Sequence, residues 1–313
     1  MPDIVITEFM DEAAVASLMA RHDTVYDPAL VDQPERLALM VGDARALVVR
    51  NRTQVRGSLL DGAVKLSCVG RLGVGLDNID IEACKARNVA VYPATGANDL
   101  SVAEYVISTA SLLLRGAYFS RDAMTDGKWP RQSLIGRELA GKTIGLVGFG
   151  SIAREVAWRA DALGMRIVAF DPYLEATHPA WMTARNVSFD GLLEVADVVS
   201  LHTPLTDRTR NLIDTKALSR MKPQAILINA ARGGIVDEAA LAEALKEGRL
   251  AGAALDVFET EPLTAQAGAK FRGIANLVLT PHIAGVTEES NIRVSQLIAE
   301  KVLAHLGGAT KAP

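Results

Sequence analysis

The sequence predicts an α/β protein built from two doubly wound parallel-sheet domains. Short apolar runs alternate with helical patterns along nearly the whole chain, as in parallel sheets wrapped by helices. A glycine-rich turn, GFGSIA, lies between two of these runs near the middle of the chain. The 313 residues, of which 49% are hydrophobic and 22% charged, are enough to form two cores.

The first third of the chain predicts a small parallel sheet. Apolar runs indicate strands at residues 3–7, 46–49, 64–69 and 89–92. Helical patterns cover residues 11–21, 35–42 and 79–87. Ligands of such sheets bind beyond the carboxyl ends of the strands. Arg50 and the loop Gly73–Gly75 each follow a predicted strand, so we expect both at a binding edge.

A long helix is predicted at residues 99–116. It is apolar over much of its circumference, which indicates burial inside a domain or in an oligomer interface. The polar stretch at 117–141 is expected to be irregular.

Residues 142–173 have the pattern of a dinucleotide-binding unit, namely strand, glycine turn, helix, strand and acid. Gly148 permits the tight turn, and Gly150 lets the backbone approach a pyrophosphate, which then meets the free N–H groups of the helix. Ala153 is small enough for the helix to pack on the strand. Asp171, 21 residues after Gly150, can bind a ribose 2′-hydroxyl and would repel a 2′-phosphate. The pattern therefore predicts binding of NAD.

Three of the later strands end in an ionisable residue within a turn. The strands are predicted at residues 198–201, 225–229, 251–257 and 277–279, with helices at 237–247 and 288–305. The three residues are Arg232, Glu261 and His282, and doubly wound sheets bring such strand ends to one crevice. An arginine can grip a carboxylate and polarise its neighbouring carbonyl, while a histidine paired with a carboxylate can exchange the hydroxyl proton. Singly such residues are usually solvated, but together they suit hydride transfer to a 2-oxo acid.

Bulk properties exclude several classes. The net charge of −4 gives no indication of a nucleic-acid or anionic-membrane partner, and no apolar run reaches the roughly 20 residues of a membrane span. The opening MPDIVITEFMDEAAV lacks the basic and apolar regions of a signal peptide. Cys68 and Cys84 lack metal-type spacing, so we interpret both as buried reduced thiols. We expect a soluble cytoplasmic protein without a metal site.

Several segments carry a resemblance to a known family. They are VRNRT at 49–53, GRLGVGLDNID at 70–80, NDLSVAEY at 98–105, GLVGFGSIA at 145–153, HTPLT at 202–206, INAARGGIVDEAAL at 228–241, AALDVFETEPL at 253–263 and LTPHIAGVTEES at 279–290. In this order and spacing, the chain resembles the D-isomer-specific 2-hydroxyacid dehydrogenases of the 3-phosphoglycerate dehydrogenase type over nearly its whole length.

The resemblance implies a Rossmann nucleotide domain, a flavodoxin-like substrate domain and a cleft between them. The substrate domain would comprise residues 1–97 and 286–313, and the NAD-binding domain residues 98–285. Relatives are dimers through the nucleotide domain, and helix 99–116 fits that contact, with a tetramer as the alternative. Lys128 and Arg131 are candidates for reaching a partner subunit's site.

The resemblance also implies roles for single residues. Arg232 would bind the substrate carboxylate and carbonyl, His282 would be the acid–base group, and Glu261 its partner. Asp256 would hold the nicotinamide carboxamide. Further NAD contacts are implied at Gly148, Gly150, Ser151, Ile152, Ala153, Asp171, Thr203, Pro204, Ala230 and Gly285. Substrate contacts are expected at Arg50, Asn51, Arg52, Val74 and Gly75, besides Arg232 and His282.

The identity of the acid is less decided. A monoanion such as lactate needs one anchor, Arg232, so Arg50, Arg52 and Arg71 suggest a second anionic group, as in 3-phosphoglycerate or 3-sulfolactate. Arg52 and Arg71 could equally be surface charges. TEFMDEAAVASL and VRNRT resemble the (S)-sulfolactate dehydrogenase branch more than typical phosphoglycerate enzymes. The alternatives are a hydroxypyruvate or glyoxylate reductase, a general D-2-hydroxyacid dehydrogenase and, more remotely, an NAD-sensing corepressor.

Overall fold

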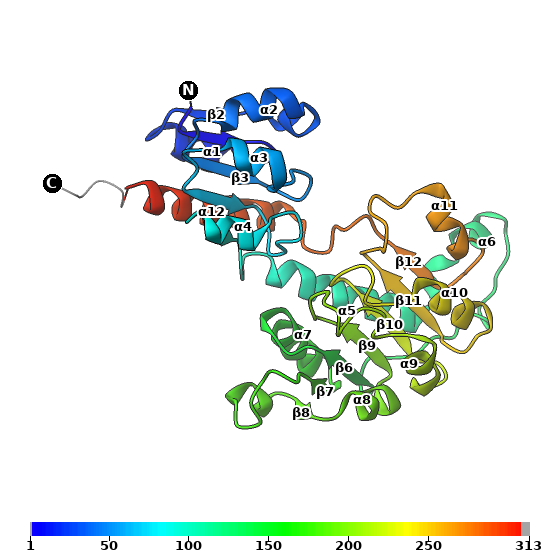
Figure 1. The fold of residues 1–313 in the computed structure, drawn as a ribbon. Helices are drawn as coiled ribbons and strands as arrows, with labels where there is room; N and C mark the ends of the chain where they lie inside the picture. Colours follow the sequence, from blue (N-terminus) through cyan, green and yellow to red (C-terminus); the bar gives the residue numbers. More distant parts are fainter. Residues whose placement is uncertain (1, 308–313) are drawn as a thin grey trace. The chain divides into compact units, whose positions relative to one another are not determined.

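The computed structural model describes residues 2–307, which fold into two compact α/β units, each around a sheet of parallel strands (Figure 1). The first unit comprises the residues up to Asn98 and those from Val286 onward, and the second runs from Asp99 to Gly285. The fold class predicted from the sequence, two α/β domains with parallel sheets, is confirmed.

A five-stranded sheet in the order β2-β1-β3-β4-β5 forms the first unit. Its strands are β1 (Ile4–Ile6), β2 (Thr24–Tyr26), β3 (Ala46–Val49), β4 (Cys68–Arg71) and β5 (Ala90–Pro93). Its helices are α1 (Glu12–Met19), the 3₁₀ helix η1 (Pro28–Asp32), α2 (Pro34–Val41), α3 (Gly57–Gly62), α4 (Ile81–Ala86) and α12 (Glu288–Gly307). Because β1 and β3 pair in parallel, the segments that follow them leave the sheet at the same edge.

Helix α12 covers the first sheet at β4. A Cβ at Gly70 would lie 2.6 Å from Cγ2 of Ile298 and 3.1 Å from Cγ2 of Val302, so the glycine lets the helix lie directly on the strand. Both side chains are fully buried, in one core with Ile6 and Val48. Burial of side chains of this size stabilises the fold by about 1.5–3 kcal/mol each.

A seven-stranded sheet in the order β12-β11-β10-β9-β6-β7-β8 forms the second unit. Its strands are β6 (Thr143–Val147), β7 (Arg166–Phe170), β8 (Arg185–Asn186), β9 (Val198–Leu201), β10 (Ile226–Asn229), β11 (Gly252–Leu255) and β12 (Leu277–Leu279). Its α-helices are α5 (Asp99–Arg115), α6 (Arg121–Thr125), α7 (Ser151–Ala162), α8 (Phe189–Val195), α9 (Thr215–Arg220), α10 (Glu238–Lys246) and α11 (Ala265–Gly268). Its 3₁₀ helices are η2 (Ala117–Phe119), η3 (Pro179–Met182) and η4 (Ala269–Phe271).

The strand order of the second sheet reverses beside β6. From β6 the chain moves outward through β7 to β8, then returns to β9 on the other side of β6 and continues to β12. Such a reversal is the point at which doubly wound sheets bind ligands, at the carboxyl ends of the strands.

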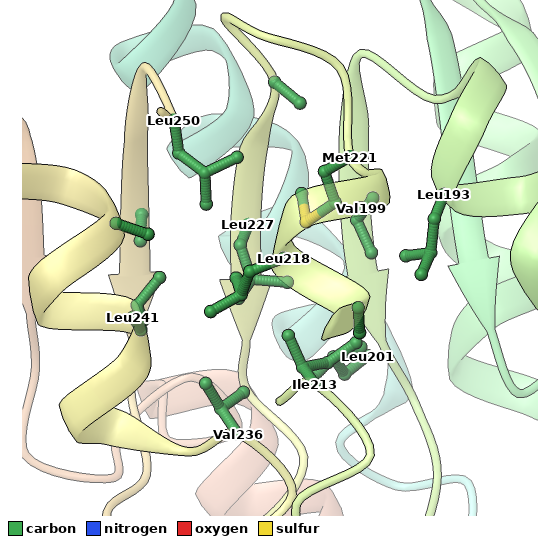
Figure 2. Packing of buried hydrophobic residues seen from close by; sticks show 14 of the residues in the cluster. Leu193, Val199, Leu201, Ile213, Leu218, Met221, Leu227, Val236, Leu241 and Leu250 are labelled. Atoms are coloured by element: carbon green, nitrogen blue, oxygen red, sulfur yellow. The ribbon is translucent and has the colours of Figure 1, made fainter. Parts of the chain in front are cut away.

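Helices cover both faces of the second sheet. Ile226 and Ile228 of β10 belong to the apolar layer under α5 and α7, whereas Leu227 between them belongs to the opposite layer. In that opposite layer Leu218 of α9 and Leu241 of α10 pack near Leu227 (Figure 2). Since both faces are covered, the strand ends are the places left for chemistry.

Most predicted elements are present with shifted ends. The strand expected at 64–69 is found at Cys68–Arg71, because Val64 is 73% exposed and the residues before Cys68 form a turn. Strands β2 and β8 were not predicted, since neither TVY nor RN contains a run of apolar residues. The region expected to be irregular, 117–141, contains η2 and α6.

Candidate active site

The glycine turn between β6 and α7 is shaped by a neighbouring loop. Gly148 has φ +88°, and a Cβ there would lie 2.6 Å from the carbonyl oxygen of His202, so only glycine fits. Gly150 has φ −74°, and no protein atom lies within 4 Å of where its Cβ would be. The protein itself therefore requires glycine at 148, whereas at 150 it leaves open space in front of α7.

The amino end of α7 is suited to an anion. Gly150 caps the helix without any side-chain hydrogen bond, and the first N–H groups, from Ser151 and Ile152 onward, have no partner within the helix. These N–H groups and the helix dipole attract negative charge. Ala153, fully buried, lets the helix pack closely on the sheet, as its small size predicted.

Asp171, at the end of β7, is fixed beside the glycine turn. Its Oδ2 accepts a hydrogen bond from the N–H of Phe149 (2.9 Å), and its Oδ1 accepts one from the N–H of Tyr173 (2.9 Å). A carboxylate oxygen has two acceptor positions, so each oxygen can still receive a hydroxyl proton. The turn and the acid thus form one preorganised structure.

The loop after β9 lies against the same turn. Nε2 of His202 is 2.9 Å from Oγ of Ser200, and burial lowers the pKa of His202 to about 4, so the ring is neutral at neutral pH. The backbone nitrogen of Thr203 lies 3.3 Å from where a Cβ of Gly148 would be. Thr203 and the following Pro204 are therefore held next to the glycine turn.

Three adjacent strands place Arg232, Glu261 and His282 in the loops that follow β10, β11 and β12. Nδ1 of His282 is 2.7 Å from Oε2 of Glu261, and the N–H of Phe258 donates to Oε1 of Glu261 (3.0 Å). His282 has φ +55°, a left-handed conformation that few residues other than glycine adopt. Strain of this kind persists where surrounding bonds hold the residue in place.

The charge of Glu261 is stabilised by its neighbours. Burial raises the pKa of Glu261, but the hydrogen bonds from His282 and the Phe258 N–H, together with the positive charge of Arg232, hold this pKa below its usual range. The carboxylate is therefore ionised at neutral pH and can orient the imidazole, leaving Nε2 of His282 to face a reacting group.

The loop that carries Arg232 is held by Asn229. Asn229 is almost fully buried; its Nδ2 donates to the carbonyl of Arg232 (2.9 Å), and its Oδ1 accepts from the N–H of Ala231 (3.1 Å). Ala230 lies between these groups, at the end of β10. The amide thus fixes the backbone on both sides of Ala231.

Asp256 fixes the loop that carries His282. Its Oδ1 accepts from Oγ1 of Thr280 (2.6 Å) and the N–H of Ile283 (2.8 Å), and its Oδ2 accepts from the N–H of Ala284 (2.8 Å). The hydroxyl of Tyr105, on α5, is 2.7 Å from Oγ1 of Thr280 and extends this network. The buried carboxylate of Asp256 positions the loop that ends at Gly285, a structural role that the sequence did not indicate. Its Oδ2 keeps one acceptor position.

In the first unit, a buried carboxylate holds the loop of the expected substrate contacts. Glu8, just after β1, is 5% exposed and accepts four backbone N–H groups. Oε1 accepts from Arg50 (2.9 Å) and Thr53 (3.0 Å), and Oε2 from Asn51 (3.3 Å) and Arg52 (3.1 Å). This loop is therefore rigidly defined.

The two arginines of this loop have different surroundings. Nη2 of Arg50 donates to Oδ1 of Asn291 (2.8 Å), and its guanidinium lies over the ring of Phe9. Arg52, in contrast, forms a two-pronged ion pair with Asp32 in an exposed position.

The glycine loop of the first unit, Gly73–Gly75, follows β4, the strand next to β3. A Cβ at Gly73 would lie 1.4 Å from Nη1 of Arg71, so the arginine side chain folds over that glycine. Val74 and Gly75 follow, both half-buried. Glycine at 73 therefore makes room for the guanidinium of Arg71.

The sequence did not indicate Glu8, Tyr105, Thr280 or Asn291. Each acts through a partner between 42 and 241 residues away, except that Thr280 lies 24 residues from Asp256. An acid directly after the first strand was a usable signal for Glu8, because it lies at a carboxyl end.

In the described part of the chain, no three metal-ligating side chains are grouped to hold an ion. Within residues 2–307, no helix is both long and apolar enough to cross a bilayer.

Comparisons with known proteins agree with this geometry. The profile of the D-isomer specific 2-hydroxyacid dehydrogenase NAD binding domain matches residues 107–284. The chain is 53% identical over 308 residues to an (S)-sulfolactate dehydrogenase of Chromohalobacter salexigens (98% of this chain, 99% of the relative). It is 36% identical to a hydroxypyruvate reductase of Thermotoga maritima (96% and 97% covered). A D-lactate dehydrogenase of Aquifex aeolicus, solved with NAD and lactic acid, has a TM-score of 0.84 at 26% identity (97% and 96% covered).

The chain belongs to the D-isomer specific 2-hydroxyacid dehydrogenase family. It is an NAD-dependent oxidoreductase that interconverts 2-hydroxy acids and 2-oxo acids, and the predicted resemblance to the sulfolactate branch is confirmed. The residues present fit NAD, because the open space at Gly150 and the amino end of α7 can receive a pyrophosphate, and Asp171 can receive a ribose hydroxyl.

Proposed function

We propose that this enzyme acts on a 2-hydroxy acid that carries a second anionic group, with 3-sulfolactate and sulfopyruvate as its substrate pair. The observation that carries the proposal is Arg50, a partly buried guanidinium held by Asn291 and Phe9 in the first unit. The second unit already supplies Arg232 for the carboxylate that all 2-hydroxy acids share, so a monoanion would leave Arg50 without a role.

The residues of the second unit support the following division of labour. Arg232 grips the carboxylate and polarises the C2 oxygen. During oxidation the C2–H bond breaks as hydride leaves, and the hydroxyl proton passes to Nε2 of His282, whose Nδ1 bonds to Glu261. Bound NAD supplies the hydride acceptor, and reduction reverses each of these transfers. A positioned acid–base group of this kind contributes about 10²–10⁴ in rate.

The remaining contacts complete the proposed site. Asn51, Arg52, Val74 and Gly75 would contact substrate through the first unit. Bound NAD would meet the turn residues Gly148–Ala153, the ribose-binding Asp171, and Thr203, Pro204, Ala230, Asp256 and Gly285. The (S)-enantiomer of 3-sulfolactate has the spatial arrangement of an R-2-hydroxy acid, since sulfur changes the priority ranking. The relative of 53% identity is named for that compound, which supports sulfonate over phosphate.

The test is a steady-state panel in the reducing direction. Sulfopyruvate, 3-phosphohydroxypyruvate, hydroxypyruvate and glyoxylate are each offered with NADH and with NADPH, and kcat/KM is compared. We expect sulfopyruvate with NADH to exceed hydroxypyruvate by at least about tenfold, and Arg50→Ala to abolish that preference by raising KM for sulfopyruvate. Higher kcat/KM for hydroxypyruvate or glyoxylate would instead establish the reductase alternative.

We further propose a cytoplasmic homodimer formed through the second unit. Large apolar side chains are exposed in the segment after α5, among them Tyr118, Ile135 and Trp129, which is 77% exposed. A second copy of the chain would bury them, and we include in this proposal a contribution of Lys128 and Arg131 to the partner's site. Sedimentation equilibrium measures the oligomeric state of the wild type and of Trp129→Glu, and a monomeric wild type at micromolar concentration would contradict the proposed dimer.

The proposed cytoplasmic location is supported by dependence on NAD and by two free, buried cysteines.

A further inference from the structure

The backbone of Arg50 is fixed before any ligand binds. The N–H of Arg50 donates to the carboxylate of Glu8, and the carbonyl oxygen of Arg50 accepts a hydrogen bond from Nδ2 of Asn78 (3.3 Å). The carboxylate of Glu8 is occupied by four backbone donors, and it forms no ion pair of its own with Arg50 within residues 2–307. The direction of the Arg50 side chain is therefore left to the groups around its guanidinium.

Two neutral groups hold that guanidinium. Nη2 donates to Oδ1 of Asn291 (2.8 Å), and Cζ lies 5.9 Å from the centroid of the Phe9 ring. Burial lowers the pKa of Arg50, whereas the nearby charge of Glu8 raises it, so the cation is partly desolvated. Among the described residues, no carboxylate lies within ion-pair distance of this head group.

Arg52, two residues further on, shows the alternative arrangement. Its guanidinium forms an ion pair with the carboxylate of Asp32, so a negative charge already lies beside it. An amide accepts the same kind of hydrogen bond as a carboxylate but carries no net charge. Arg50 is consequently oriented by an uncharged partner, whereas Arg52 is oriented by a carboxylate.

Asn291 is itself on a rigid support. It lies in the first turn of α12, where its N–H donates to the carbonyl of Thr287 (3.0 Å). Thr287 and Ser290 cap this turn by exchanging hydrogen bonds between side chains and backbone N–H groups (2.8 and 3.1 Å). Further along the helix, Oγ of Ser295 accepts from the N–H of Asp11, at the start of α1 (3.0 Å). The side-chain amide of Asn291 is therefore held in place by the helix and fixes the position of the Arg50 guanidinium.

We infer that Asn291 is a positioning residue that sets the preference for a doubly anionic acid, because it aims the Arg50 cation while leaving its charge for the substrate. This inference rests on the proposed role of Arg50. It explains why an asparagine suits position 291: a carboxylate there would pair with Arg50 and repel the anion that Arg50 is meant to bind.

The experiment compares sulfopyruvate with hydroxypyruvate, which differ only in the group on C3. KM and kcat are measured with NADH for the wild type, Asn291→Ala, Asn291→Asp and Arg50→Ala. The matched control is Gln296→Ala, which removes an exposed amide from the same helix. Asn291→Asp keeps the shape of the side chain, so a folding defect is not expected. Far-UV circular dichroism and NADH binding show whether the two Asn291 variants are folded.

We expect Asn291→Ala to raise KM for sulfopyruvate about tenfold, the usual effect of one hydrogen bond to a charged group. Asn291→Asp should raise it about a hundredfold, because it adds a competing charge. KM for hydroxypyruvate and kcat for both acids should change less than about threefold, as should every constant of Gln296→Ala.

Equal losses on both acids, or no loss on either, would overturn the inference. If Arg50→Ala itself fails to distinguish the two acids, the proposed substrate class fails with it. If Arg50→Ala distinguishes them and the Asn291 variants do not, only the role of Asn291 is wrong.

Discussion

Replacing Gly233 with alanine should separate the loop that carries Arg232 from the loop that carries Glu261. Gly233 follows Arg232, and a Cβ there would lie 1.8 Å from the carbonyl oxygen of Phe258 and 2.1 Å from its carbonyl carbon. Real Cβ contacts below 3.0 Å essentially do not occur, so the two backbones must move apart by at least about 1.2 Å. Both neighbours are backbone atoms, so no side-chain rotation can relieve the clash.

The expected cost follows from that displacement. The N–H of Phe258 donates to Oε1 of Glu261, so a shift of the Phe258 backbone carries this carboxylate away from Arg232. Misplacement of reacting groups by about 1 Å costs about 10²-fold in rate, so kcat/KM should fall at least a hundredfold. Binding of NADH at the Gly148 turn should change little, because that turn contacts the loop after β9.

The assay is kcat/KM with the best acid of the panel, accompanied by NADH fluorescence titration to show that the second unit is folded. The control is Gly62→Ala, at the end of α3, where a Cβ would meet no atom within 4 Å. That variant should retain activity within about twofold. If Gly233→Ala retained more than a third of the wild-type kcat/KM, the claim that contact between these loops sets the catalytic geometry would be refuted.

Three further predictions concern single carboxylates. Glu8→Gln replaces one oxygen that receives two N–H groups by an NH₂ group, so the free energy of unfolding should fall by about 2–4 kcal/mol in urea titrations; an unchanged midpoint would show that the loop does not need the charge. Asp171→Asn removes the repulsion of a 2′-phosphate, so the ratio of kcat/KM for NADH over NADPH should fall about tenfold, and a constant ratio would assign the preference elsewhere. The pKa of Glu261 is lowered in the folded protein, so its stabilising effect is present above its unfolded value of 4.5 and is lost as pH falls through the lower folded value. Glu261→Gln should therefore lose less stability than wild type between about pH 5 and pH 3, and parallel acid-unfolding curves would contradict this.

Much of the second unit could be predicted from local sequence. The glycine turn, the acid after β7 and the strand-end positions of Arg232, Glu261 and His282 all depend on patterns within about 30 residues, and chain topology then brings them to one edge. The bond between His282 and Glu261 was expected and is present in the structure.

The supporting contacts could not be predicted in this way. Asn291 reaches Arg50 across 241 residues of sequence, and Tyr105 reaches Thr280 across 175. Neither contact has a periodic or spacing signal, because each depends on how a helix is rotated against a loop. Likewise the sequence could not show that Arg52 is paired with Asp32 and Arg50 is not, although both arginines lie in the same pentapeptide.

The position of α12 on β4 has a consequence for biosynthesis. The strands of the first sheet leave the ribosome before the whole second unit, roughly 190 residues or about 10–40 s at usual elongation rates, and only then does the helix that covers Gly70 emerge. Throughout that interval Ile6 and Val48 lack the apolar partners Ile298 and Val302. Until α12 emerges, the face of the first sheet that carries Ile6 and Val48 is therefore covered only in part, by α1, whereas the second unit, whose strands and helices are contiguous, can already be complete.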